Sequence, residues 1–190
     1  MESTRKVLSV LVILAMVTSQ QAAPVERRGK ELINFVCAKT VNKEMCVEVL
    51  SSDPNRSPNA DLKDLAIISL RVAAKNASGI LSDAKRLIND DKLSPDIQQG
   101  LADCKETILD AESQLEDTLA ALLVNSMTDT QVWLKAALAA IDTCDASIPG
   151  DDDILSVKSV IFRKLCNIAI ATTRQSRNQF VNHVLAQTSA

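Results

Sequence analysis

The chain has 190 residues, the size of one domain, of which 46 % are hydrophobic and 24 % are charged. Its 4 glycines and 5 prolines are too few for the turns of a β-sandwich or barrel, and a net charge of −3 gives it no electrostatic attraction to nucleic acid. The single histidine, His183, argues against a Ser-His-Asp enzyme and against a multi-histidine metal site. We therefore expect a helical protein that is not an enzyme, needs no metal or cofactor, and works by surface contact.

The N-terminus has the pattern of a secretory signal peptide. Arg5 and Lys6 supply the positive charge, and residues 7–17 form an uncharged run too short to cross a bilayer as a membrane anchor. Cleavage is expected near Ala22 or Ala23; removal of residues 1–23 would leave a mature domain of residues 24–190. We expect this domain to be secreted and to have no membrane segment.

A small helical hairpin is predicted within residues 30–52, with helices at about 30–39 and 43–50. Secretion implies an oxidising compartment, in which four of the five cysteines would pair, and four cysteines allow three connectivities. Cys37 and Cys46 lie symmetrically about the hairpin turn. A bridge between them would contribute about 2–3 kcal/mol through loop entropy.

Residues 53–59 contain two prolines and polar residues, which predict a linker between the hairpin and the main body. Asn55 begins an Asn-x-Ser pattern that Pro58 weakens. Asn76 begins a second one inside a predicted helix, where such patterns are often unused. Both asparagines are possible glycosylation sites.

Four long helices are predicted within residues 60–188, because apolar residues recur there at spacings of three and four. The first spans about 61–90. Ser94-Pro95 opens the second, Thr128 or Asp129 is expected to cap the third, and the acids of 151–153 precede the fourth. The predicted core stripes are Ala66, Leu70, Ala73, Ala77, Ile80, Ala84 and Leu87; Ile97, Leu101, Cys104, Ile108, Ala111, Leu115, Thr118 and Leu122; Thr130, Leu134, Ala137, Ile141 and Cys144; and Ile154, Val157, Ile161, Leu165, Ile168 and Thr172. Short joints between such helices predict an all-α, antiparallel up-down-up-down bundle preceded by the hairpin.

Helix geometry favours a second disulfide between Cys104 and Cys144. Both lie on core stripes of antiparallel neighbours, at similar distances from the turn near residues 125–126. Cys166 is then a free thiol, best explained as a small buried hydrophobe. Trp133 flanks a core stripe and is expected to pack.

The cysteine spacing together with the bundle resembles the plant invertase and pectin methylesterase inhibitor family. Three local stretches resemble it too: residues 50–54 followed by 61–66, residues 142–145 around Cys144, and residues 165–169 around Cys166. The resemblance covers about residues 30–175. It implies an extracellular protein of the plant cell wall, or apoplast, that inhibits an enzyme.

Two activities occur on the fold of this family. The invertase inhibitors insert a Pro-Lys-Phe segment into acid invertases, and the sequence contains no Pro-Lys-Phe. We therefore favour a pectin methylesterase inhibitor that covers the enzyme's substrate cleft in a reversible one-to-one complex. An acid invertase is the alternative target, and a helical carrier of small apolar ligands is a more distant alternative.

The resemblance also implies which residues touch the target enzyme. In the pectin methylesterase inhibitors of this family, acids lie two and six positions after the first bundle cysteine. Glu106 and Asp110 occupy these positions here, and Ser113 stands where the family has a third acid. The threonine before the second bundle cysteine matches Thr143, and Asp145 follows that cysteine. The alternative interpretation is that these acids belong to an ordinary solvated helix face.

Overall fold

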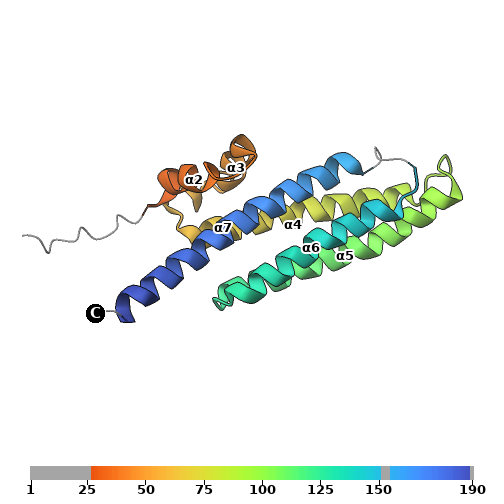
Figure 1. The fold of residues 1–190 in the computed structure, drawn as a ribbon. Coiled ribbons are helices and arrows are strands. Elements are labelled where there is room, and N and C mark those ends of the chain that lie inside the picture. The colour runs from red at the N-terminus through yellow and green to blue at the C-terminus, as the bar shows by residue number, and fades with distance from the viewer. Residues whose placement is uncertain (1–26, 151–154, 189–190) are drawn as a thin grey trace, which may run out of the picture.

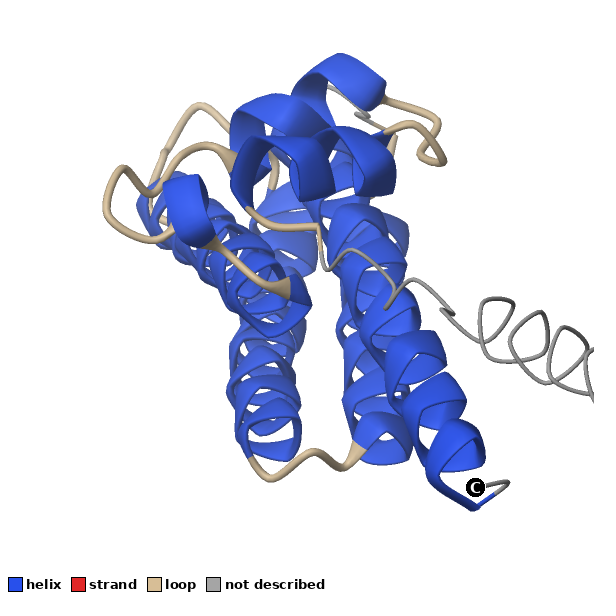
Figure 2. Cartoon of the chain, turned by 90° about the vertical axis from the view of Figure 1, so that its left-hand side faces the viewer, coloured by secondary structure: helices blue, strands red, loops and turns tan. Residues whose placement is uncertain are grey.

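The computed structural model describes residues 27–150 and 155–188, which contain helices and loops and no strand (Figure 2). The chain forms a four-helix bundle with a helical hairpin against one side (Figure 1), so the predicted fold class is confirmed. The predicted signal peptide and the acids of 151–153 lie outside the described residues. The elements are α2 (Gly29–Cys37), α3 (Lys43–Leu50), η1 (Ser57–Asn59), α4 (Leu62–Leu87), α5 (Pro95–Leu123), α6 (Met127–Ser147) and α7 (Ser156–Thr188).

The hairpin of α2 and α3 is closed by a disulfide between Cys37 and Cys46. It buries one apolar face against α4 and α7, because eight or nine residues per helix cannot form a core alone. The linker after it is ordered by side chains. The Ser57 hydroxyl donates to the carbonyl of Leu50 at 2.7 Å. The backbone N–H of Arg56 donates to the Asp53 carboxylate, which lowers the pKa of that carboxyl.

The first bundle helix, α4, is the most deeply buried. It begins with a capping box in which Asp61 and Asp64 exchange side-chain and backbone hydrogen bonds. It packs against α5 and α7 and also against α3, so apolar residues flank its predicted stripe on both sides. Among the helices of the described ranges, α4 alone is long and apolar enough to cross a membrane, but more than half of its most apolar stretch is buried inside the bundle. It is therefore a core helix.

The helices α5 and α6 form the most extensive pair in the bundle. The Ser94 hydroxyl accepts from the backbone N–H of Ile97, and Pro95 occupies the first turn, as the sequence predicts. A disulfide joins Cys104 to Cys144. Close to it, the hydroxyl of Ser147 donates to the carbonyl of Gly100 at 2.9 Å, where the two backbones approach closely.

The predicted cap of the third bundle helix is wrong. The N-cap of α6 is Ser126, whose hydroxyl donates to the Asp129 carboxylate at 2.6 Å instead of capping the backbone. The turn before it closes through Asn125, which has a positive φ of 60°. Because asparagine tolerates this left-handed conformation, α5 and α6 are joined by a very short turn and α6 begins before Thr128.

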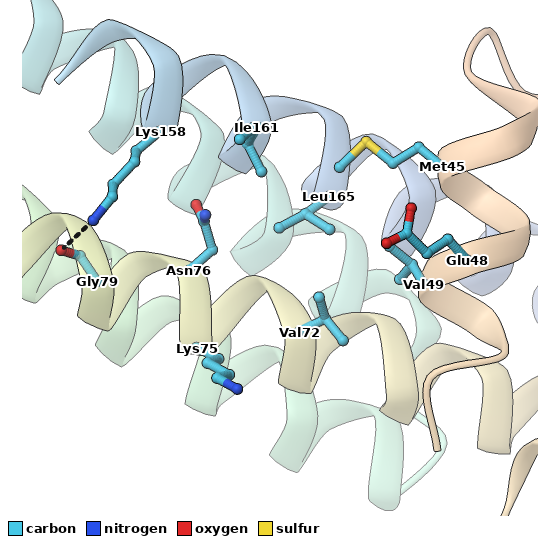
Figure 3. Close-up of a pocket in the computed structure, with 10 residues that line it drawn as sticks. All are labelled: Met45, Glu48, Val49, Val72, Lys75, Asn76, Gly79, Lys158, Ile161 and Leu165. Atoms are coloured by element: carbon cyan, nitrogen blue, oxygen red, sulfur yellow. Dashed lines mark hydrogen bonds between the residues drawn. The ribbon is translucent and has the colours of Figure 1, made fainter. Parts of the chain in front are cut away.

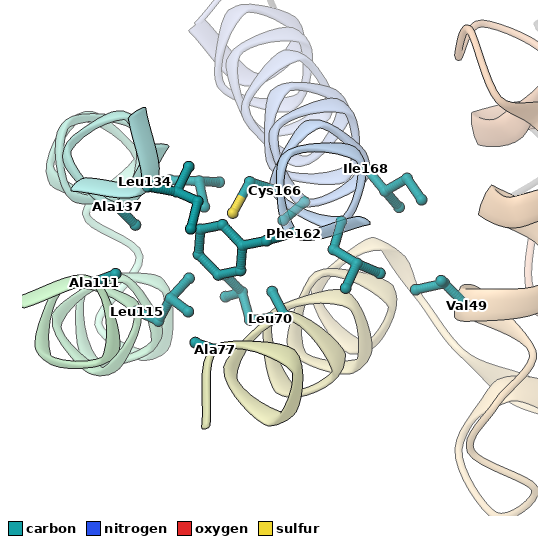
Figure 4. Close-up of a cluster of buried hydrophobic side chains, with 14 of the residues drawn as sticks. Val49, Leu70, Ala77, Ala111, Leu115, Leu134, Ala137, Phe162, Cys166 and Ile168 are labelled. Atoms are coloured by element: carbon teal, nitrogen blue, oxygen red, sulfur yellow. The ribbon is translucent and has the colours of Figure 1, made fainter. Parts of the chain in front are cut away.

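The predicted core stripe of the last helix is wrong in part. Val157 is 68 % exposed, whereas Phe162, which lies outside the predicted stripe, is fully buried, and Ile154 lies outside the described residues. The burial of Cys166 agrees with its interpretation as a small buried hydrophobe. The α4 stripe is rich in alanine, and Ala111 of α5 and Ala137 of α6 are also small, which leaves space at the centre of the bundle. Figure 4 shows the Phe162 ring in that space, among Ala77, Ala111 and other side chains. The side of α7 that faces the core is therefore the side that carries Phe162.

Candidate functional site

The predicted contact residues of α5 share one exposed surface. Glu106, Asp110 and Ser113 are separated by four and three residues, so they lie on the same side of the helix. All three are exposed, and the buried residues Cys104, Ile108 and Ala111 alternate with them. The side chains therefore point away from the bundle core.

The Cys104–Cys144 disulfide fixes the height of α5 relative to α6. Glu106 follows Cys104 by two residues and Thr143 precedes Cys144 by one, so both lie near the same level of the bundle. Thr143 is exposed, and its hydroxyl donates to the carbonyl of Ala139 at 3.0 Å. We call the exposed side of α5 and α6 that carries Glu106, Asp110, Ser113 and Thr143 the α5–α6 face.

Asp145 lies apart from this face, on the side of α6 that meets α7. Its Oδ2 atom is 2.5 Å from Nη2 of Arg163, and Nε of Arg163 is 2.8 Å from Oδ1 of Asp142. Burial alone would lower the pKa of Arg163, but the hydrogen bonds to the two aspartates outweigh it and raise that pKa above its usual value. Asp145 is thus engaged within the bundle, and its predicted contact with a partner remains only a prediction.

The bundle divides by charge into two layers, α5 with α6 and α4 with α7. The first layer carries ten acidic and two basic residues, whereas the second carries ten basic and two acidic residues. In the described part of the chain, no ion pair joins an acid of α5 to a cation of another helix. The overall charge of −3 therefore conceals a strongly negative α5–α6 layer, which would attract a basic partner.

Two apolar residues beside this face were not predicted as contacts. Val132 is 54 % exposed and Trp133 is 39 % exposed, although Trp133 was expected to pack. Val132 precedes Thr143 by eleven residues, about three helical turns, so the two lie on one side of α6. Exposed tryptophans often contribute strongly to protein interfaces. The sequence could have indicated the exposure of Val132 and Trp133, because both fall between the predicted stripe positions of α6.

The two possible glycosylation sites differ in exposure. Asn55 is exposed, but Ser57 of its pattern is buried and donates to Leu50. Asn76 lies in α4 with its amide oxygen buried, and Ser78 of its pattern donates to Glu112. Glycosylation at either position stays a prediction.

The bundle interior is packed by side chains, and one pocket of about 380 Å³ lies outside it, between the hairpin and the bundle (Figure 3). In the described residues no group of three or more histidine, cysteine or acidic side chains could hold a metal ion. Burial raises the pKa of the Cys166 thiol to about 12, so this cysteine is a poor nucleophile. The α5–α6 face is therefore the best candidate for a site that acts by binding a protein.

Comparisons with protein families, with curated proteins and with solved structures all find inhibitor proteins of plants. Residues 31–172 match a family model described as plant invertase/pectin methylesterase inhibitor. A pectinesterase inhibitor of Actinidia deliciosa is 27 % identical over 169 residues, covering 86 % of this chain and 89 % of the relative. A protein of Platanus acerifolia named "Putative invertase inhibitor" is 30 % identical over 132 residues, covering 66 % of this chain and 73 % of its own length. A crystal structure of a mutant pectin methylesterase inhibitor from Arabidopsis shares the fold, with a TM-score of 0.64 and 23 % identity over 75 % of this chain and 95 % of that one.

Proposed function

Because this chain belongs to the plant invertase/pectin methylesterase inhibitor family, a family of inhibitor proteins and not of enzymes, we propose that it inhibits pectin methylesterase. The inhibitor binds over the substrate cleft of the enzyme in a reversible one-to-one complex and excludes pectin. No bond is made or broken, and inhibition is steric.

The observation that carries this proposal is the exposed, negative α5–α6 face. Helix α5 has 29 residues and is therefore about 43 Å long. A standard interface buries about 800 Å² on each partner, and α5 together with the adjacent 21-residue α6 can supply that area. Glu106 and Asp110 would meet cationic or hydrogen-bonding groups of the enzyme, with Ser113 and Thr143 beside them. Asp145 would contribute at the edge while it remains bound to Arg163.

The exposed apolar residues add binding energy that charge alone does not supply. Exposed ion pairs at the rim of an interface mainly change the association rate and the salt dependence. Trp133 and Val132 can be desolvated when the enzyme docks, and burying such side chains stabilises complexes directly. The proposed site therefore combines acids that attract a basic enzyme with an apolar patch on α6.

Acid invertase is a second candidate target, and the Platanus acerifolia relative is the observation that favours it. Pectin methylesterase is preferred because the relative named for pectinesterase covers more of this chain, 86 % against 66 %. The chain also lacks a Pro-Lys-Phe segment.

The setting that we propose is the plant cell wall. The two disulfides fit an oxidising, extracellular compartment, as does the predicted signal peptide of residues 1–23. Both target enzymes would be met there.

The proposal is tested by titrating the purified mature protein, residues 24–190, against a plant pectin methylesterase and, separately, a plant acid invertase. We expect pectin methylesterase activity to fall to a plateau at one inhibitor per enzyme, with invertase activity unchanged. Loss of invertase activity alone would replace the proposed target, and no loss of either would refute inhibition.

A further inference from the structure

The last helix, α7, carries positive charges that the protein does not neutralise. Five of its 33 residues are lysine or arginine, and none is acidic. Lys158 and Arg163 are bound by aspartates of α4 and α6. For the other three, Lys164, Arg174 and Arg177, the described part of the chain supplies no ion pair. We call these three residues the α7 cations.

The α7 cations lie on the side of the helix that faces away from the core. Ala171 and Asn178 follow Lys164 at intervals of seven residues, so these three lie on one side of α7. Arg174 lies between Ala171 and Asn178 on the same side, and Arg177 flanks it. Both arginines are exposed, and Lys164 is half-buried. The three charges therefore form a row about 20 Å long on the surface.

This row is turned away from the acidic helix α5. The helices α5 and α7 each pack against α4 and α6, so they lie diagonally across the bundle from each other (Figure 4). Neighbouring helix axes are about 8–10 Å apart, so the diagonal is about 11–14 Å before the outward side chains are added. The Debye length at physiological ionic strength is about 8 Å. The acids of α5 therefore repel an anion at the α7 cations only weakly.

The acids of the neighbouring helix α6 do not cancel the row either. Asp142 and Asp145 are both bound by Arg163, and Asp129 accepts a hydrogen bond from Ser126. An anion can therefore approach the α7 cations from solvent. Guanidinium groups bind carboxylates through two parallel N–H bonds, and a lysine adds a point charge. The row suits a partner with several carboxylates in sequence.

The proposed function supplies such a partner. When a methylesterase hydrolyses a methyl ester of pectin, water is consumed, methanol and a proton are released, and a carboxylate stays on the sugar. Repeated hydrolysis turns a neutral polysaccharide into a polyanion. An inhibitor bound to the enzyme is therefore surrounded by a polymer of the charge that the α7 cations attract. The amide of Asn178, exposed beside Arg174, can hydrogen-bond the sugar hydroxyl groups.

We propose that the α7 cations bind de-esterified pectin while the α5–α6 face binds the enzyme. The choice of polymer rests on the proposed function. A second copy of the chain, offering its acidic α5–α6 face, is the less favoured partner, because each copy has a net charge of −3 and the contact would be open-ended. Binding to de-esterified pectin retains the inhibitor where the enzyme has already acted.

The test measures binding of an end-labelled oligogalacturonate to the mature protein by fluorescence anisotropy, with no enzyme present. We expect saturable binding that weakens as salt is added, because cations that bind a polyanion release its counterions. The fully methyl-esterified oligomer has the same sugars without the charges and should not compete. Since no enzyme is present, a failure here leaves the proposed inhibition standing. A failure to inhibit the enzyme would likewise leave this binding measurable.

Replacing the α7 cations should weaken this binding without unfolding the protein. The triple variant Lys164→Gln, Arg174→Gln, Arg177→Gln should bind the oligomer at least about tenfold more weakly, the combined effect of three exposed charge contacts. Circular dichroism checks that it is folded. Its inhibition of pectin methylesterase should equal that of the parent, because the α7 cations lie outside the α5–α6 face.

The matched control removes three positive charges from elsewhere on the surface. The variant Lys92→Gln, Lys105→Gln, Lys135→Gln changes the α4–α5 loop, α5 and α6, and should keep the affinity of the parent. Equal losses in the two triple variants would overturn the inference, as would competition by the methyl-esterified oligomer or the absence of saturable binding. Tighter binding to phosphatidylserine vesicles, or salt-sensitive self-association of the parent, would replace pectin with a membrane or a second copy.

Discussion

Arg163 of α7 lies between two aspartates of α6, with its Nη2 atom 2.5 Å from Oδ2 of Asp145. Both Asp145 and Arg163 are about one-third exposed, so water screens this pair less than a surface ion pair. A second nitrogen of Arg163, Nε, lies 2.8 Å from Oδ1 of Asp142, which is about one helical turn from Asp145 along α6. These bonds lie on the α6–α7 side of the bundle, away from Thr143 and Glu106.

Replacing Arg163 with glutamine should reduce the free energy of unfolding by about 1–2 kcal/mol, because charge-assisted hydrogen bonds to two carboxylates are lost. Urea unfolding followed by circular dichroism measures the change. The matched control is Arg174→Gln, which removes an exposed arginine of the same helix and should change stability by less than about 0.5 kcal/mol. Equal effects of the two substitutions would show that the Arg163 contacts add nothing.

Replacing Gly100 with alanine should destabilise the protein by about 1–3 kcal/mol, although alanine is the better helix former. The added Cβ would overlap the carbonyl oxygen of Ser147 and lie 2.9 Å from Cα of Ile148, so α5 and α6 must separate. The control is Gly79→Ala, where a Cβ has space and stability should rise by about 0.5–1 kcal/mol. A stable Gly100→Ala variant would contradict the close approach of the two helices.

The thiol of Cys166 should be unreactive in the native protein. Burial raises its pKa from 9.0 to about 12, so almost no thiolate exists at pH 8. Iodoacetamide should modify it only as fast as the protein unfolds, whereas in guanidinium it should react quickly, with both disulfides intact. Non-reducing peptide mapping should then find the 37–46 and 104–144 bridges and a label at Cys166 alone. Rapid native labelling would show that Cys166 is accessible.

The same pKa shift predicts a pH dependence of stability. Below pH 9 the thiol is protonated in both the folded and the unfolded chain, so it has no effect. Between about pH 9 and pH 12 the unfolded chain releases the proton and the folded chain keeps it, so the free energy of unfolding falls as pH rises. Cys166→Ala should lose less stability over this range than the parent protein. Identical pH profiles of the two proteins would contradict the raised pKa.

The fold was predictable because the apolar residues of each bundle helix recur at helical spacing within its own sequence. Of the eight stripe positions predicted for α5, seven are buried and Ile97 is half-buried. This helix packs on one side only, against the rest of the bundle, so a single periodic stripe describes it well. The loose pattern of α7 could not reveal its rotation, since the position of Phe162 depends on alanines of three other helices.

The exposure of the candidate site residues was predictable, but their contacts within the bundle were not. Glu106 and Asp110 are exposed because they lie on the side of α5 that faces away from the core stripe of that helix. The engagement of Asp145 by Arg163 joins residues eighteen positions apart on different helices, and no local pattern indicates it. The exposure of Trp133 likewise depends on how closely α5 packs against α6.

Removing both acids of the α5–α6 face should weaken inhibition without unfolding the protein. We expect Glu106→Ala with Asp110→Ala to slow association with pectin methylesterase and to reduce its dependence on salt, because both charges are exposed in the free inhibitor. Stopped-flow association at two salt concentrations measures both effects. The control, Asp90→Ala with Asp91→Ala in the α4–α5 loop, removes the same charge elsewhere. If the two double variants behave alike, Glu106 and Asp110 act only through net charge.

The most direct measurement is the inhibition constant of Thr143→Trp against plant pectin methylesterase, beside the parent and Asn167→Trp. Both threonine and asparagine are exposed on helices, but only Thr143 lies on the α5–α6 face. If the α5–α6 face covers the substrate cleft, Thr143→Trp should raise the inhibition constant at least about tenfold, equivalent to about 1.4 kcal/mol, while Asn167→Trp leaves it unchanged. An unchanged constant for a folded Thr143→Trp variant would contradict docking through the α5–α6 face.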